Sequence, residues 1–238
     1  MIIGIIHPMS IVLRPYQERD VERLRQSYRD GFKSPLYVAP CGAGQTVLFA
    51  HMASRAVKRG REVAILVHRR ELIDQCAVAL GASDVPYTTV GSRYEYDRTQ
   101  PVKICSVPTL VKRLSWTHPG LIIIDEAHHS NAQSWRDIIA ANPRSLRLGV
   151  TATPSRMDGQ GLAEFFDTLV LGPSYEELTN EGYLTPARAW APESVSASGV
   201  RIRGGDYEYS GIREAATRPH VTGDCMSHYQ KYAAGRRA

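Results

Sequence analysis

Residues 40–46, Pro-Cys-Gly-Ala-Gly-Gln-Thr, form a glycine-containing loop that could bind phosphate groups. Gly42 and Gly44 allow the backbone to curl so that its amide groups point inward at an anion. The hydroxyl of Thr46 is placed to ligate magnesium. The loop could also be a tight strand-to-helix turn, but a pair of carboxylates at residues 125–126 favours a nucleoside-triphosphate site. Its expected phosphate-binding residues are Gly42, Ala43, Gly44, Gln45 and Thr46.

Gln45 occupies the position at which phosphate loops carry a lysine. A lysine there reaches the β- and γ-phosphates and neutralises charge that grows during phosphoryl transfer. Glutamine is shorter and neutral, so it donates a hydrogen bond without supplying a cation. Because the loss of one transition-state donor costs about 100- to 1,000-fold in rate, we expect severely weakened hydrolysis and weaker nucleotide binding.

Asp125, Glu126 and His128 follow the uniformly apolar run Leu-Ile-Ile-Ile of residues 121–124. Two adjacent carboxylates at the end of a buried strand are costly unless they have a function. Near a phosphate loop, Asp125 can hold Mg²⁺, while Glu126 can orient and deprotonate an attacking water. His128 can sense the nucleotide state and relay it to neighbouring loops. Alone, Asp-Glu-Ala-His could be a polar helix start, but with the loop it indicates a catalytic site of Glu126, Asp125 and Gln45.

Short apolar strands alternate with amphipathic helices between residues 36 and 150. This alternation predicts an α/β fold of three layers, with a mostly parallel central sheet that helices cover on both faces. Ligands of such sheets bind beyond the carboxyl ends of the strands, where both motifs lie. We expect strands at 36–39, 63–67, 102–105, 121–124 and 146–150, and helices at 46–58, 71–80 and 134–141.

The regular pattern weakens after about residue 185. Residues 186–220 are rich in Ser, Gly, Arg and Tyr and have little hydrophobic periodicity. They are expected to be a linker or an irregular segment. Residues 221–234 could form one more helix. We therefore expect a first domain over residues 1–185 and the beginning of another over residues 221–238.

With these features the sequence resembles the superfamily 2 helicases, in the DEAH-box branch that includes type III restriction-enzyme subunits and phage-type helicases. The resemblance covers about residues 11–190 and rests on six segments in the family's order. Besides the phosphate loop and Asp-Glu-Ala-His, the segments are Leu-Arg-Pro-Tyr-Gln (13–17), His-Arg-Arg-Glu-Leu (68–72), Ser-Val-Pro-Thr-Leu (106–110) and Thr-Ala-Thr-Pro (151–154). Ser-Arg-Met-Asp-Gly (155–159) extends the last segment as in restriction-type helicases.

The resemblance implies a RecA-like P-loop NTPase domain that binds ATP and Mg²⁺. Gln17 would recognise the edge of the adenine. Arg69, Arg70 and Thr109 would hold the phosphates of a single nucleic-acid strand, in contacts that are independent of base sequence and weaken with salt. The arginine pair alone could equally be a solvated helix start.

Three further residues would couple nucleotide chemistry to the rest of the domain. Thr151 and Thr153 would hydrogen-bond to the acidic motif and transmit its movement, with His128 as the sensor. Thr-Ala-Thr alone could be an ordinary strand end. The order of all the segments favours the helicase interpretation over a nucleotide kinase or another P-loop enzyme, because neither explains Gln17 and Thr-Ala-Thr-Pro.

The family's motors have two RecA-like domains with ATP between them, and no motif of the second domain follows residue 185. Residues 221–238 are therefore expected to begin a truncated second motor domain. One hypothesis is the N-terminal motor domain of an ATP-dependent DNA or RNA helicase or translocase, disabled by Gln45 and by the missing domain. The other is a non-catalytic, helicase-derived module that binds nucleic acid or a protein partner. The restriction-type segment favours single-stranded or duplex DNA over RNA.

Composition is compatible with both hypotheses. The net charge of +5 suits a polyanionic partner but also an ordinary solvated surface. The four cysteines form no Cys-x-x-Cys pair, so neither a zinc site nor a disulfide framework is expected. Free thiols suit a reducing cytoplasm, here that of a bacterial or phage-infected cell. The apolar runs are too short to span a bilayer, so no membrane association is expected.

Overall fold

A computed structural model describes residues 12–67, 70–91, 97–112, 118–129, 132–154, 162–187, 202–203, 206–207 and 219–235. The chain divides into two compact units, Met1–Thr185 and Pro186–Ala238. Both sequence motifs of the expected nucleotide site lie in the first unit. None of the described helices is both long and apolar enough to cross a lipid bilayer.

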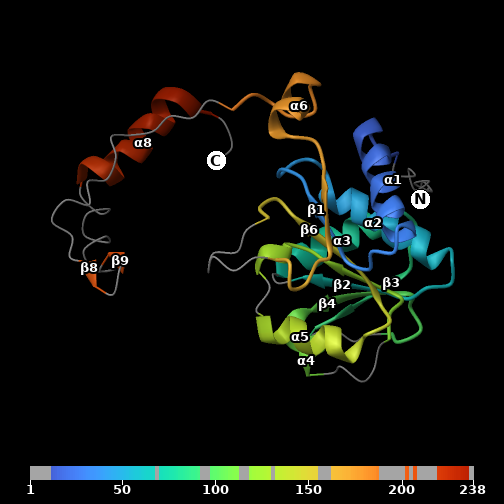
Figure 1. The fold of residues 1–238 in the computed structure, drawn as a ribbon. Helices are drawn as coiled ribbons and strands as arrows, with labels where there is room; N and C mark the ends of the chain where they lie inside the picture. Colours follow the sequence, from blue (N-terminus) through green and yellow to red (C-terminus); the bar gives the residue numbers. More distant parts are fainter. Residues whose placement is uncertain are drawn as a thin grey trace, which may run out of the picture. The chain divides into compact units, whose positions relative to one another are not determined.

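A seven-stranded parallel sheet forms the centre of the first unit (Figure 1). Its strand order is β3-β4-β2-β5-β6-β1-β7, so the expected α/β fold with a parallel sheet is confirmed. Every pairing within it is parallel, which is the geometry that helical crossovers impose. The strands are β1 (Pro35–Val38), β2 (Val63–Val67), β3 (Tyr87–Val90), β4 (Val102–Ser106), β5 (Leu121–Ile124), β6 (Leu146–Thr151) and β7 (Thr168–Leu171).

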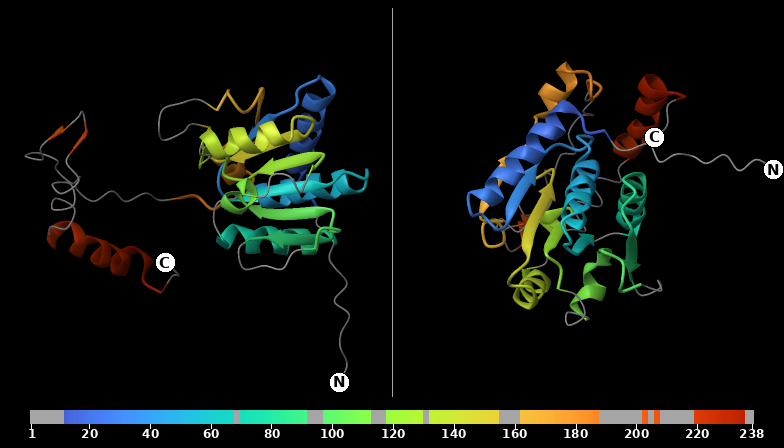
Figure 2. Two further views of the ribbon diagram at one scale, coloured as in Figure 1. Left: turned by 90° about the horizontal axis from the view of Figure 1, so that it is seen from below. Right: turned by 90° about the vertical axis from the view of Figure 1, so that its right-hand side faces the viewer.

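Helices cover both faces of this sheet, which gives the three expected layers (Figure 2). Helices α1, α2 and α3 pack on one face, and α4 and α5 pack on the other. Helix α5 begins two residues before the position expected from the sequence. The helices of this unit are α1 (Pro15–Arg29), α2 (Gln45–Val57), α3 (Arg70–Ala82), α4 (Val107–Val111), the short 3₁₀ helix η2 (Ala127–His129), α5 (Ala132–Ala141) and α6 (Tyr175–Asn180).

Alternate residues of the central strands β2 and β5 enter two separate hydrophobic cores. Ile65 and Ile123 pack in the core beneath α1–α3, whereas Leu66 and Ile124 pack in the core beneath α4 and α5. All four side chains are at most 1% exposed. Because both faces of the strands must be apolar, the runs contain no alternating polar residues. These buried runs fix the strand ends from which the site residues extend.

The second unit contains a short hairpin and a helix. Strands β8 (Ile202–Arg203) and β9 (Asp206–Tyr207) pair antiparallel within the segment that was expected to be irregular. Helix α8 spans Pro219–Ala233, close to the helix expected at residues 221–234.

Gly149 is a position at which the sheet tolerates no side chain. It lies in β6, and a Cβ added there would be 2.4 Å from Cε1 of Phe166 and 2.8 Å from Cδ1 of Leu36. We expect Gly149→Ala to lower the free energy of unfolding by about 1–3 kcal/mol because the core must shift to accept the methyl group. Urea denaturation measures this change.

Gly81→Ala is the matched control for that substitution. Gly81 lies in α3, and an added Cβ would meet no atom within 4 Å. Since alanine is the better helix former, the control should stabilise the protein by up to about 1 kcal/mol. Equal effects of the two substitutions would contradict the packing described for Gly149.

Candidate functional site

The two expected halves of the nucleotide site lie on strands that flank a common neighbour. Strand β1 leads into the glycine loop, β5 leads into Asp125, and β6 lies between β1 and β5. The carboxyl ends of parallel strands meet at one edge of a sheet, so the halves share that edge. Two inter-strand spacings separate them, about 10 Å. The fold therefore brings together the motifs that the sequence analysis paired.

The glycine loop has the curled backbone expected of it. Gly42 and Gly44 have φ angles of +86° and +74°, which favour glycine because a side chain is strained there. The amide of Ala43 donates a hydrogen bond to the carbonyl oxygen of Pro40 (3.1 Å). Helix α2 begins at Gln45, so the last loop residues lie at a helix N-terminus, which favours anions.

Gln17 is tied to this loop in a way that the sequence does not predict. Its side-chain amide donates to the carbonyl oxygens of Ala43 (3.1 Å) and Gly44 (3.3 Å), and its oxygen accepts from the amide of Arg14 (2.9 Å). The hydroxyl of Tyr16 also donates to the Ala43 carbonyl (2.9 Å). Gln17 is only 3% exposed. Adenine recognition by Gln17 stays a prediction and would require these bonds to exchange.

The side chain of Gln45 is hydrogen-bonded to the backbone beneath the loop. Its amide nitrogen donates to the carbonyl oxygen of Ala39 at 2.5 Å. Ala39 itself donates from its amide to the carbonyl oxygen of Thr151 (3.2 Å), which connects β1 to β6. The residue in the lysine position thus stabilises the loop base and contributes no cation. Thr46, the expected Mg²⁺ ligand of the loop, is half-buried in the first turn of α2.

Asp125 and Glu126 form a strained turn immediately after β5. Glu126 has a φ angle of +50°, a backbone conformation that residues other than glycine adopt at a cost of roughly 1–3 kcal/mol. The amide of Glu126 donates to Oδ1 of Asp125 at 3.0 Å. Such strain is found where a side chain must be held in a functional position. Oε2 of Glu126 is buried and accepts no hydrogen bond from the described residues.

The Asp125 carboxyl group is unusually difficult to ionise. It is 6% exposed, and burial together with the charge of the Glu126 carboxylate raises its pKa to about 6, against the lowering effect of the hydrogen bond from the Glu126 amide. A buried carboxylate with a raised pKa is stabilised when a cation binds beside it. This property fits the expected role of Asp125 as a Mg²⁺ ligand.

His128 and Thr151 link the acidic turn to the end of β6. The Thr151 hydroxyl donates to the carbonyl oxygen of Thr153 (2.9 Å) and accepts from the amide of Thr153 (3.1 Å). Nδ1 of His128 lies 2.8 Å from the same hydroxyl oxygen and 3.4 Å from Oε2 of Glu126. The three expected coupling residues therefore form one chain of contacts with Glu126, although their coupling role stays a prediction.

This geometry predicts the tautomer of His128. Because the Thr151 hydroxyl hydrogen is used by Thr153, the histidine must donate, and its proton must lie on Nδ1. We expect ¹⁵N NMR of the ring to show the Nδ1-protonated form, which the Glu126 carboxylate 3.4 Å from Nδ1 also favours, and we expect Thr151→Val to lower stability by about 1–3 kcal/mol. A ring protonated at Nε2 and not at Nδ1 in the unsubstituted protein would contradict the network.

The expected nucleic-acid residues follow two adjacent strands. Arg69 lies outside the described residues, and Arg70 is described only as the first residue of α3, which follows β2. Thr109 is half-buried in α4, which follows β4. Since β2 and β4 pair with Val67 opposite Ser106, both segments begin at the same edge. Their contacts with a strand stay a prediction, and residues 155–159 lie outside the described part of the chain.

An aromatic cluster beside Gln17 went unnoticed in the sequence. The rings of Tyr16 and Tyr183 meet edge to face with centroids 5.1 Å apart, and the guanidinium of Arg14 lies 5.0 Å from the centre of the Tyr183 ring. Leu184 also approaches the loop, where a Cβ on Gly42 would lie 2.8 Å from its Cδ2. Only tertiary folding brings residues 183–184 to the loop, so no local pattern could reveal this contact.

Comparison with known proteins identifies the family to which the chain belongs. Residues 10–156 match the family described as type III restriction enzyme, res subunit. The chain belongs to this family of superfamily 2 helicases. Its first unit is the N-terminal RecA-like domain, so the resemblance inferred from the motifs is confirmed. The Asp-Glu-Ala-His turn and the glycine loop both lie within the matched residues.

Individual relatives agree with this assignment. A 51.5 kDa protein of a Lactococcus phage (isolate 7-9) is 33% identical over 84% of this chain and 42% of its own length. The Saccharomyces cerevisiae protein IRC3, named as a candidate ATP-dependent helicase, is 31% identical over 74% of this chain and 28% of its own length. The chain thus spans less than half the length of these relatives.

A solved structure supports the fold. The type ISP restriction-modification enzyme LlaGI, in complex with a DNA substrate mimic, superposes with a TM-score of 0.57 at 15% identity. The superposition covers 93% of this chain and 24% of that enzyme. At this identity the likeness concerns the fold alone.

Proposed function

We propose that this chain is the N-terminal ATP-binding motor domain of an ATP-dependent DNA helicase or translocase, with RNA as the alternative substrate. The observation that carries the proposal is the pairing of a curled phosphate loop with the strained Asp125-Glu126 turn on strands that flank β6. Membership of the family supports a helicase-type motor. The DNA mimic bound to LlaGI and the restriction-type segment favour DNA.

The residues fit a magnesium nucleotide in most respects. Loop amides between Gly42 and Thr46 would hold phosphates, and Thr46 and Asp125 would hold Mg²⁺, which neutralises developing phosphate charge when bound. Glu126 would orient and deprotonate the attacking water, with His128 beside it. Gln45 is the one departure, since it offers an amide where the chemistry requires a cation.

We further propose that hydrolysis by this chain is severely impaired. The reason is that Gln45 supplies no charge to the phosphates at the position where the chemistry requires a cation. In this proposal residues 1–185 are the first motor domain, 186–220 a linker and 221–238 the start of the second domain. The phage relative supports a cytoplasmic setting in a bacterial or phage-infected cell.

A non-catalytic binding module is the second candidate function. The hydrogen bond from Gln45 to Ala39 favours it, because it gives the substituted side chain a structural use. In that case the fold would hold nucleic acid or a partner protein without consuming ATP.

Separate titrations of a fluorescent ATP analogue and of a labelled single strand distinguish the candidates. A motor domain should bind both, and its strand affinity should fall steeply with salt, equally for different base sequences. A control strand titration with RNA of the same length tests the preference for DNA. Binding of neither ligand would contradict the motor proposal, and retained strand binding without nucleotide binding would favour the module.

A further inference from the structure

A basic cavity lies at the amino-terminal edge of the sheet in the first unit. Its volume is about 540 Å³, within the range of ligand-binding cavities. Half of its ten lining residues are arginines: Arg25 and Arg29 on α1, Arg55 on α2, and Arg59 and Arg61 between α2 and β2.

The cavity is remote from the nucleotide site. Leu121 and Leu146, the first residues of β5 and β6, line it, whereas the phosphate loop lies at the opposite ends of the strands. Helix α2 begins at the phosphate loop and reaches the cavity with its last turn. Its 13 residues correspond to a separation of about 20 Å. The proposed motor function therefore does not explain these arginines.

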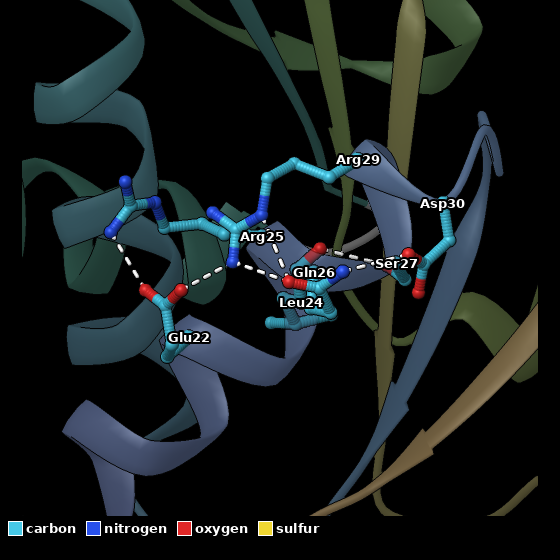
Figure 3. Close-up of polar contacts among 7 residues, drawn as sticks. All are labelled: Glu22, Leu24, Arg25, Gln26, Ser27, Arg29 and Asp30. Carbon is cyan, nitrogen blue, oxygen red and sulfur yellow. Dashed lines mark hydrogen bonds and ion pairs between the residues drawn. The ribbon is translucent and has the colours of Figure 1, made fainter.

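Two of the arginines are already satisfied within α1. The carboxylate of Glu22 accepts a hydrogen bond from Arg25 (2.8 Å) and another from Arg29, while Nε of Arg29 also donates to Gln26 (2.9 Å), as Figure 3 shows. Within the described part of the chain, the side chains of Arg55, Arg59 and Arg61 have neither an ion pair nor a hydrogen bond. Three cations thus remain for a ligand.

The positive charge of this region lowers the pKa values of two neighbouring titratable groups. The hydrogen bond from Arg29 lowers the pKa of Glu22, and the charges of Arg25 and Arg55 lower it further against the opposing effect of burial. Burial and the charge of Arg55 lower the pKa of His51 on the adjacent turn of α2, as do Lys58 and Arg25. An acidic ligand would relieve this accumulation of positive charge.

The floor of the cavity is apolar, and apart from the arginines its lining has one polar side-chain group, the Tyr28 hydroxyl. Met52, Ala56 and Leu121 are at most 9% exposed. The hydroxyl of Tyr28 is already used, since it donates to the carbonyl oxygen of Arg147 at 2.7 Å. A nucleobase there could replace its hydrogen bonds to water only through the arginines, which do not accept, and the Tyr28 oxygen, so its own N–H groups would be poorly satisfied. An aliphatic or aromatic side chain would lose none.

We propose that this cavity docks an acidic peptide segment of a partner protein. An apolar side chain of that segment would lie on the Tyr28 and Met52 floor. Carboxylates on either side of it would pair with Arg55, Arg59 and Arg61. Guanidinium groups bind carboxylates in a bidentate manner, and an aromatic or aliphatic anchor within an arginine rim is a common centre of protein interfaces. Nucleic-acid backbones carry the charge but lack the apolar anchor.

Fluorescence anisotropy with designed peptides tests the proposal. The probe has a central phenylalanine flanked on both sides by aspartate and glutamate, and a second probe replaces the phenylalanine with alanine. We expect the phenylalanine peptide to bind at least about 10-fold more tightly. Arg55→Glu combined with Arg59→Glu should weaken its binding by at least about 10-fold. Lys112→Glu, the same charge reversal at the exposed end of α4, should leave it unchanged.

Several outcomes would overturn the proposal. Absence of peptide binding, equal binding of both peptides, or equal binding by the arginine variant would each exclude a built site. A short DNA duplex that binds more tightly than the peptide and depends on Arg55 and Arg59 would assign the cavity to nucleic acid instead. Thermal unfolding verifies that the double variant is folded. If it is unfolded, the peptide titration is repeated with the single variant Arg59→Ala, whose residue lies in the connection after α2.

Discussion

Replacing Gln45 with lysine is expected to tighten the binding of a non-hydrolysable ATP analogue with Mg²⁺ by about 10- to 100-fold. A charged hydrogen bond contributes about 1.5–3 kcal/mol, which corresponds to that range. In the structure Gln45 donates to the carbonyl oxygen of Ala39, so its amide is directed to protein backbone. A lysine is longer and carries the charge that the phosphates require. Isothermal titration calorimetry measures both affinities.

Two different effects of the lysine substitution must be separated. The gain could arise from the new charge or from release of the bond to Ala39. Gln45→Met has a similar length, no charge and no donor, and it serves as the control. If methionine and lysine increased the affinity equally, the charge explanation would be wrong.

The same pair of chains also tests the proposed loss of catalysis. In single-turnover hydrolysis, the Gln45 chain should be slower than its lysine variant by about 100- to 1,000-fold. Equal rates would show that the glutamine is catalytically competent and would remove the reason for considering the chain impaired.

The core of the fold was predictable because five of its strands are mostly apolar, although the strands at 102–105 and 146–150 include Lys103 and Arg147. Runs such as residues 121–124 can be buried only when both faces of a sheet are covered, so the sequence alone indicates the layers. Strand β3 was missed because threonines at 88 and 89 interrupt the apolar pattern. Thr88 is nevertheless 7% exposed, and its hydroxyl accepts a hydrogen bond from the amide of Asp97 (3.0 Å).

Strand β7 was missed for a different physical reason. It lies at the edge of the sheet and pairs only with β1 among the described strands. Leu169 and Leu171 are more than half exposed, so its side chains carry no clear burial pattern. The carbonyl oxygen of Leu171 accepts a hydrogen bond from Arg23 of α1, a contact between distant parts of the sequence. Edge strands of this kind are defined by partners that sequence does not specify.

The candidate site also has features that the sequence predicts and features that it does not. Its glycines, hydroxyls and carboxylates form local motifs, and their spacing identified them. The φ angle of Glu126 could not be foreseen, because glutamate has no preference for the left-handed region. The bonds from Gln17 to the glycine loop also escaped prediction, since they depend on the packing of α1 against α2. Motifs therefore indicate which residues act, and tertiary contacts determine the conformations in which they are held.

Asp125→Asn is expected to lower Mg²⁺-dependent nucleotide affinity by at least about 10-fold. Magnesium in such sites is held by one or two carboxylates, and asparagine supplies no charge. The affinity of the analogue should be measured with Mg²⁺ and with EDTA for each chain. We expect Mg²⁺ to increase the affinity of the aspartate protein for the analogue and to change the affinity of the asparagine variant only slightly. Asp137→Asn, a carboxyl group on α5 outside the motifs, should retain the full Mg²⁺ effect.

The same substitution should stabilise the metal-free protein at neutral pH. The folded pKa of Asp125 is raised from 3.8 to about 6, so the folded state prefers the protonated carboxyl group. Its contribution to stability is fully present below pH 3.8 and is lost as the pH rises through about 6. The difference corresponds to about 3 kcal/mol as an upper limit. Asp125→Asn should therefore raise the free energy of unfolding at pH 8, with the advantage disappearing toward pH 4.

Opposite pH trends in binding and stability make this prediction specific. Below pH 6 the proton competes with Mg²⁺ for Asp125, so Mg²⁺-dependent affinity of the aspartate protein should fall about tenfold per pH unit. Urea denaturation in EDTA and nucleotide titration with Mg²⁺, both from pH 5 to pH 8, provide the two profiles. If Asp125→Asn instead destabilised the protein at pH 8 while Mg²⁺ dependence persisted, Asp125 would be a structural residue, because its carboxylate would then be needed for folding and dispensable for the metal.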